Sequence, residues 1–274
     1  MAERTAGIVL AGGRSTRMGV PKATLEWHGS TLVRRATGIV ARAVDGPVVV
    51  VRAAGQALPP LPPHIELVDD ELADRGPLQG IAAGLRQIGE RAPVVFVTGV
   101  DTPLLHPAFV ACVLRSLRPP DEAAVPCAGG FVQPLAAAYR RAPLARALAG
   151  QLASGDRSGR RLVARLAAHT LDEAALLGDP RVAQLDPHLD SLRNVNTPED
   201  YEDARGRPAP RVTVRPRPGA APISVGAATL GRAAAAAGVP LYPGAVTVLD
   251  GHGPIADPDE PLAAGDALTI TTRP

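Results

Sequence analysis

Short apolar runs alternate with longer amphipathic stretches along the first part of the sequence. Two apolar runs predict buried strands, at 6–11 and 94–97, and two β-branched runs predict further strands, at 48–51 and 65–68. Three stretches repeat apolar residues at helical spacing and predict helices, at 31–44, 77–88 and 107–117. This alternation predicts an α/β domain around a mostly parallel sheet. Ligands of such sheets bind beyond the carboxyl ends of the strands.

The patterns that follow are weaker but still readable. They predict a strand at 135–139 and helices at 143–152 and 160–168. Thr197 is followed by Pro198 and, three positions on, by Asp200. A helix commonly begins with such a capping box, so we expect a last helix that ends near Arg205.

A Pro-rich break at 206–210 divides the chain. We therefore expect one domain over 1–205 and a second over 211–274. The second part predicts strands at 211–215, 245–249 and 267–272, and a helix at 229–237 closed by Gly238. These elements predict a small α+β module.

Composition excludes several classes of function. The net charge is +2 and there are seven aromatic residues, with no basic stripe of the kind that nucleic acids require. No apolar window is long enough to predict a membrane span. Cys112 and Cys127 are too few for a disulfide framework or a four-ligand zinc site. Since the first residues enter a strand without a signal-peptide pattern, we expect a cytoplasmic protein.

Two residue types are rare enough to draw attention. Lys22 is the single lysine among 29 basic residues, and the two asparagines are Asn194 and Asn196. A residue type that the chain otherwise avoids is expected where a substitute would fail.

The loop after the first strand reads LAGGRSTRMGVPK and predicts a polyphosphate site. Gly12 and Gly13 allow backbone N–H groups to approach an anion. Arg14, Arg17 and Lys22 add three cations at the sheet edge, as a triphosphate requires. The spacing fits neither a Walker loop nor a dinucleotide fingerprint. The alternative is an ordinary solvated loop.

Two acidic segments stand at the ends of other predicted strands. Asp101 follows the run at 94–97 and is placed to hold Mg²⁺, although a turn or helix-capping role is equally compatible. Asp70 ends the run at 65–68, close in sequence to Gly80. The glycines there could admit a flat base while the Asp accepts hydrogen bonds from a sugar or base. The alternative is a routine helix-start turn.

Four segments in this order resemble the MobA-type molybdenum cofactor guanylyltransferases of the nucleotidyltransferase superfamily: LAGGRSTRMGVPK, VDDELADRGPLQG, VDTPLL and NVNTPEDY. The resemblance covers about residues 5–205. It implies a Rossmann-like three-layer fold and a transfer of GMP from GTP to molybdopterin, with Mg²⁺ as cofactor and pyrophosphate as the second product.

The resemblance also implies a role for each matching residue. Asp70 would reach the guanosine, Asp101 would bind Mg²⁺, and Asn194 and Asn196 would lie beside the pterin substrate. The nucleotide and its phosphates would be bound by the remaining matches: Leu10, Ala11, Gly12, Gly13, Arg14, Arg17, Lys22 and Gly80. Arg17 would offset charge on the leaving pyrophosphate. The chain departs from the family at Arg52, where Asn is expected, and at Gln133, where His is expected before Pro134.

The segment VLDGHGPIADPDEPLAAGDALTI resembles the ubiquitin-like β-grasp domains of the MoaD/ThiS sulfur-carrier kind. Such carriers work through a terminal Gly-Gly, whereas this sequence ends in TTRP. We therefore expect a docking or stabilising role for this domain, with an enzyme of the cofactor pathway as its partner.

Two alternatives remain open. The first keeps the chemistry and changes the substrates, with CTP as donor or with another phosphorylated acceptor such as a phosphosugar or phospholactate. The second is a non-catalytic nucleotide-binding adaptor. The presence of Arg14, Arg17, Lys22 and Asp101 together favours the enzyme, because an adaptor could have lost any of them.

Overall fold

The computed structural model describes residues 3–13, 18–70, 76–239, 241 and 246–271. Its larger domain is built on a sheet with these strands: β1 (Thr5–Leu10), β4 (Val48–Ala53), β5 (Ile65–Asp70), β6 (Val94–Gly99), β7 (Ala123–Ala128), β8 (Phe131–Val132), β9 (Ala136–Arg140) and β10 (Ala168–Leu171). The strands run in the order β10-β7-β9-β6-β1-β4-β5, and β8 pairs with β7. Only β9 on this path runs antiparallel to its neighbours. The prediction of a mostly parallel sheet is confirmed.

The helices of this domain follow the sequence pattern closely at first. They are α1 (Leu32–Ala41), α2 (Pro77–Ile88), α3 (Pro107–Ser116), α4 (Arg141–Ala153), α5 (Gly159–Val163), α6 (Glu173–Leu177), α7 (Pro180–Leu185) and α8 (Pro198–Gly206). The helix predicted at 160–168 is wrong in its second half, because the chain there turns into the edge strand β10. Within the described ranges, no helix combines the length and apolar character needed to cross a bilayer.

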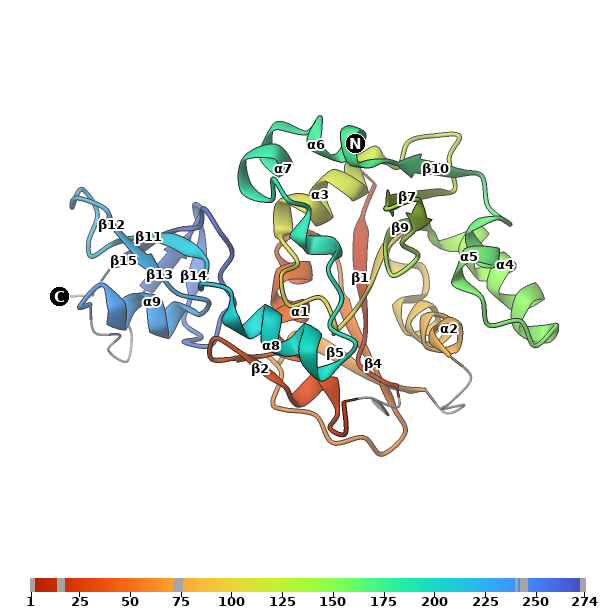
Figure 1. Cartoon of the computed structure of the whole chain (residues 1–274), viewed down its shortest axis with the longest axis horizontal. Coiled ribbons are helices and arrows are strands. Elements are labelled where there is room, and N and C mark those ends of the chain that lie inside the picture. Colours follow the sequence, from red (N-terminus) through yellow and green to blue (C-terminus); the bar gives the residue numbers. More distant parts are fainter. Residues whose placement is uncertain (1–2, 14–17, 71–75, 240, 242–245, 272–274) are drawn as a thin grey trace.

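Helices cover both faces of the sheet and give three layers (Figure 1). One apolar cluster joins alternate strand residues such as Val9 and Phe96 to α1 and α3. The other joins Ile8 and Val97 to α2 and α4. Because both faces of the central strands are buried, their sequences are apolar without alternation.

Short elements connect these layers at the sheet edge. The 3-10 turn Lys22–Thr24 leads into a hairpin of β2 (Glu26–Trp27) and β3 (Ser30–Thr31). The buried Trp27 indole donates to the Ala204 carbonyl of α8 at 2.8 Å. The predicted capping box of α8 is present, with Thr197 and Asp200 bonded to each other's backbone.

The C-terminal part forms a second sheet around one helix. Its elements are β11 (Arg211–Arg215), β12 (Ile223–Gly226), α9 (Leu230–Ala236), β13 (Val246–Leu249), β14 (His252–Ile255) and β15 (Ala267–Thr271). The order is β12-β11-β15-β13-β14. The central pair, β11 and β15, is parallel. This is the β-grasp arrangement that the resemblance to the MoaD/ThiS carriers implies. The pattern missed β12 and β14, whose sequences ISVG and HGPI are short and interrupted by Gly or Pro.

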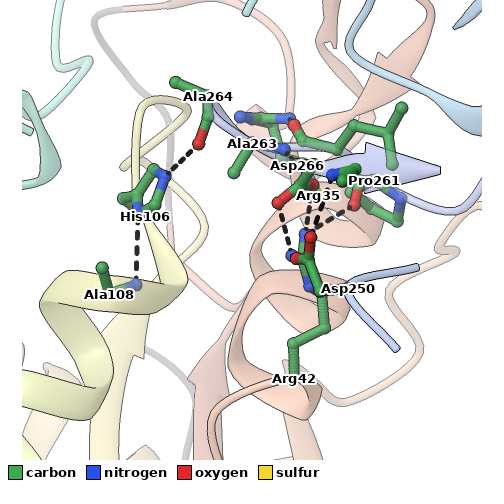
Figure 2. Close-up of polar contacts among 11 residues, drawn as sticks. Arg35, Arg42, His106, Ala108, Asp250, Pro261, Ala263, Ala264 and Asp266 are labelled. Atoms are coloured by element: carbon green, nitrogen blue, oxygen red, sulfur yellow. Dashed lines mark hydrogen bonds and ion pairs between the residues drawn. The ribbon is translucent and has the colours of Figure 1, made fainter. Parts of the chain in front are cut away.

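The two domains are packed against each other, with α1 at the contact (Figures 1 and 2). Arg42, the C-cap residue of α1, donates both terminal nitrogens to Asp266 of the second domain, at 2.6 and 2.7 Å. The Asp266 side chain is only 4% exposed, so loss of either partner would strand a buried charge at a cost of about 3–5 kcal/mol. Nearby, Ala228 packs into one apolar cluster with Trp27 and Val195 of the first domain.

Glu260 gives this contact a dependence on pH. Burial raises the pKa of its carboxyl group to about 7, with Asp257 and Asp266 adding to the rise and Arg42 and Arg34 opposing it. The folded chain therefore holds this proton more tightly than the unfolded chain. The stability that protonated Glu260 contributes is complete below the unfolded pKa near 4.5 and is lost as the pH rises through 7.

The variant Glu260→Gln should remove this loss. We expect it to unfold at a temperature a few degrees above the parent at pH 8, and at nearly the same temperature at pH 4.5, since about 1 kcal/mol corresponds to roughly 2–4 °C in a chain of this size. Thermal melting followed by circular dichroism measures the difference. Glu90→Gln, at a side chain that is 96% exposed, is the matched control. An equal difference in unfolding temperature between variant and parent at both pH values would contradict the raised pKa of Glu260.

Candidate active site

A pocket of about 1010 Å³ opens at the carboxyl ends of β1, β4, β5 and β6. This is the edge at which ligands bind in open α/β sheets. Eight of the residues predicted from the sequence line it: Leu10, Ala11, Gly12, Gly13, Lys22, Asp70, Gly80 and Asp101. Arg14 and Arg17 lie outside the described residues.

Gly12 is required for a close approach between strands. A Cβ at this position would lie 2.9 Å from the Ala53 nitrogen of β4, so only glycine fits. Its own N–H donates to the Val51 carbonyl at 3.1 Å. The sequence predicts that this N–H binds an anion. In the structure it donates its hydrogen bond to the neighbouring strand β4 instead. Gly12 therefore shapes the pocket floor by its lack of a side chain.

Lys22 joins segments that are far apart in the chain. Its Nζ donates to Asn196 Oδ1 at 2.9 Å, across 174 positions of sequence. The same Nζ lies 3.4 Å from Asp101 Oδ2. The Lys22 and Asp101 side chains are 19% and 26% exposed, so the pair is partly shielded from water. The rare lysine and one of the rare asparagines are thus in direct contact.

The loop that carries Asp101 is held on both sides. The Val100 N–H donates to the Leu10 carbonyl at 3.1 Å, which ties the end of β6 to the end of β1. The Val195 N–H donates to the Asp101 carbonyl at 2.8 Å, which ties the loop to the NVN segment. The Thr102 hydroxyl donates to the Gly99 carbonyl at 3.3 Å. Hydrogen bonds to two neighbouring segments and one within the loop therefore fix the position of Asp101.

The capping box of α8 fixes Asn196 in turn. The Asp200 carboxylate accepts the N–H groups of Asn196 and Thr197 at 2.8 and 2.9 Å, and these bonds lower the pKa of Asp200. Asn196 is thereby aimed at Lys22. Asn194 lines a second hollow of about 410 Å³ beside Leu104 and is not among the residues that line the main pocket.

The structure adds two residues that sequence reasoning did not assign to the site. Gln56 lines the pocket, accepts the Ala53 N–H at 3.0 Å and donates to the Ala11 carbonyl at 3.1 Å. Arg52 lines it too and donates from Nε to Asp69 Oδ1 at 2.6 Å. Arg52 and Asp69 are partners in the parallel register of β4 and β5, so that register could have revealed the pair. A lone glutamine in a loop gives no comparable signal.

The charges of the described pocket lining are mixed. Asp70 and Asp101 are its acidic residues, and Lys22 and Arg52 are its basic residues. Over the described ranges, no three His, Cys, Asp or Glu side chains gather into a metal-binding group. A divalent cation here would take one carboxylate from the protein and further oxygens from a phosphate or water, as Mg²⁺ commonly does.

Comparison with known proteins shows the family to which this sequence belongs. The model of the MobA-like NTP transferase domain matches residues 7–171. A probable molybdenum cofactor guanylyltransferase of Natronomonas pharaonis is 37% identical over 213 residues, which cover 76% of this chain and 99% of that protein. A protein of the same description from Opitutus terrae is 40% identical over 166 residues, or 60% of this chain and 80% of that one.

Solved structures share the fold at low sequence identity. Molybdopterin-guanine dinucleotide biosynthesis protein A of Archaeoglobus fulgidus superposes with a TM-score of 0.56 at 22% identity, over 73% of this chain and 96% of that one. The 2-C-methyl-D-erythritol 4-phosphate cytidylyltransferase of Thermus thermophilus gives 0.52 at 20% identity, over 72% and 96%. Together with the matching family model, these relatives show that the chain is a nucleotidyltransferase and belongs to the MobA-like NTP transferase family.

Proposed function

We propose that this enzyme transfers GMP from GTP to molybdopterin or its molybdenum form and releases pyrophosphate. The observation that carries the proposal is the meeting of Lys22 and Asp101 in the pocket lining, with Asn196 in contact with Lys22. Its choice of substrates is supported by relatives at 36–41% identity, each described as a probable molybdenum cofactor guanylyltransferase.

In the proposed step, an oxygen of the acceptor phosphate attacks the α-phosphorus of the nucleotide in line with the leaving group. A P–O bond forms there, and the bond from the α-phosphorus to the oxygen bridging the β-phosphate breaks. Pyrophosphate departs with that electron pair. Such a transfer depends on positioning and electrostatics, so no covalent protein intermediate is needed.

Lys22 would serve this step as a point charge. Its ammonium lies between the carboxylate side of the site and Asn196, where it can donate to phosphate oxygens of both substrates. Asn196 orients the ammonium through a neutral amide, which adds no charge of its own beside the Asp101 carboxylate. Arg14 and Arg17 stay predicted phosphate contacts on the basis of the sequence.

Asp101 is the residue proposed to hold Mg²⁺. Its single carboxylate at the strand end provides the hard oxygen ligand that this ion prefers, and phosphate oxygens would complete the coordination. When bound, the ion would neutralise charge on the phosphates during transfer.

Recognition of the nucleoside is proposed for the opposite side of the pocket. Asp70 at the end of β5 would accept hydrogen bonds from ribose or base, beside Gly80 of α2. Leu10, Ala11 and Gly13 would contact the nucleotide from the end of β1. We place the catalytic unit at 1–205, the linker at 206–210 and the ubiquitin-like domain at 211–274, in a cytoplasmic protein.

The assay that tests the function is pyrophosphate release with GTP, CTP or ATP and molybdopterin, with and without Mg²⁺. Release only with GTP, molybdopterin and Mg²⁺ together is the expected result. Release with CTP, or with another phosphorylated acceptor in place of molybdopterin, would keep the chemistry and overturn the substrate assignment. Nucleotide binding with no acceptor turned over would favour the adaptor.

Replacement of Lys22 by Ala should lower turnover about 100- to 1000-fold, because one preorganised charge at the reacting phosphates is lost. Lys22→Arg should restore little of the lost turnover, since a planar guanidinium does not replace a compact ammonium between the oxygens of Asp101 and Asn196. Both are measured as pyrophosphate release. Arg146→Ala, at an exposed arginine of α4, is the control. Near-normal turnover of Lys22→Ala would remove the assigned role.

Replacement of Asp101 by Asn should weaken the response to Mg²⁺ as well as lower turnover. The amide keeps the shape of the side chain and loses the charge that holds a hard cation. A Mg²⁺ titration of pyrophosphate release should therefore shift to higher concentration by about tenfold or more, with Glu90→Gln unchanged. An identical titration midpoint in Asp101→Asn and the parent would place the cation elsewhere.

A further inference from the structure

One face of α1 contacts the second domain. Arg35 and Gly38 of α1 and its C-cap residue Arg42 are spaced three and four positions apart, so they lie on one side of the helix. Arg42 forms the bidentate pair with Asp266 (Figure 2). The backbone of Gly38 packs on Pro261, whose ring atoms Cγ and Cδ would lie 2.7 Å from any Cβ at this position. A larger residue at 38 would therefore push the Pro261 loop away.

Arg35 connects this contact to the active site. Its side chain is buried, with the residue only 2% exposed, and its guanidinium lies 4.2 Å from the ring centre of Trp27. Nη1 donates to the Leu262 carbonyl of the second domain at 3.0 Å. Nε donates to the Pro103 carbonyl of the first domain. One rigid fork thus joins a loop from each domain.

The first-domain end of this fork is the loop that carries Asp101. Pro103 stands two positions after Asp101 in that loop. A second tether follows at His106, the N-cap of α3. Its Nδ1 accepts the Ala108 N–H at 3.0 Å, so its Nε2 carries the proton and donates to the Ala264 carbonyl at 2.9 Å (Figure 2). Residues 262 and 264 of the second domain therefore hold both ends of the 103–106 segment.

The energetics favour a fixed connection over a transient one. Burial lowers the pKa of the Arg35 guanidinium to about 9, which leaves it charged at neutral pH. A buried cation is tolerated only when hydrogen bonds satisfy its donors. If the second domain moved away, Arg35 would lose the Leu262 carbonyl, and its hold on Pro103 would loosen with it.

We propose that the β-grasp domain is a fixed structural part of the catalytic site, and that Arg35 is the positioning residue through which it holds the Asp101 loop. The domain acts through its 261–266 segment on α1, from within the same chain. The kinetic part of this inference rests on the proposed transfer reaction. The structural part, that the packing of the second domain orders the segment 100–106, does not depend on that reaction.

The test introduces a larger side chain at the contact between the domains, in the full-length chain. Gly38→Ala should displace the Pro261 loop, while alanine favours the helix itself by about 1 kcal/mol over glycine. We expect turnover to fall about 10- to 100-fold, as for other small misplacements of a catalytic group, with the KM for GTP within about twofold of the parent. The double variant Gly38→Ala, Pro261→Ala should recover turnover, because alanine lacks the two clashing ring atoms.

The matched control breaks a contact between the domains that does not reach the Asp101 loop. Asp257→Asn removes the ion pair with Arg34 and should leave turnover unchanged. Arg35→Lys, which keeps the charge and loses the fork, should resemble Gly38→Ala. Equal turnover in parent and Gly38→Ala, with the contact shown to be open, would overturn the proposal.

Hydrogen exchange provides a readout that does not depend on the reaction. Amides of residues 100–106 should exchange about tenfold faster or more in Gly38→Ala, and return to the parent rate in the double variant. If the parent released no pyrophosphate from any nucleotide, the proposed function would fail, and this exchange measurement would still decide the positioning role. Unchanged exchange at 100–106, together with faster exchange at 261–266, would show that the loop does not need the second domain.

Discussion

Strands that are buried on both faces can present polar chemistry only at their ends. In β1, β4 and β6 every face is covered by helices, so the polar loops that follow them gather at one edge. The pocket, the Lys22 turn and the Asp101 loop all lie there. The site is a consequence of how the sheet is packed, and the requirement for glycine at position 12 follows from the same crowding.

The sequence predicts this edge well and the domain contact poorly. Apolar runs and the rare residues Lys22 and Asn196 predict the strand ends and two members of the site, because burial on both faces and unusual residue choice leave local signals. Arginines at helical spacing on α1 look like a solvated face, since nothing local distinguishes water from a second domain. Short strands such as β12 and β14 were missed for a related reason: their place in the sheet is set by partners far along the chain. The Gly12 amide was assigned to a ligand because the approach of β4 is invisible in the sequence.

Helix caps and a hairpin, which usually have only local structural roles, support the site here. The capping box of α8 ends a loop and also fixes the backbone of Asn196, whose side chain meets Lys22. His106 caps α3 and also reaches the second domain. Trp27 closes a hairpin, bonds α8 and supports the Arg35 guanidinium. Each of these residues performs two tasks at once, so a substitution chosen to probe helix stability would also disturb the site.

The buried fork of Arg35 has a consequence for how the molecule folds. Separation of the domains would expose the apolar cluster around Trp27 and deprive a buried cation of one of its acceptors. An open form with both sheets intact is therefore disfavoured relative to the closed chain. The two sheets, although each has its own core, are expected to melt in one cooperative transition, with calorimetric and van't Hoff enthalpies that agree.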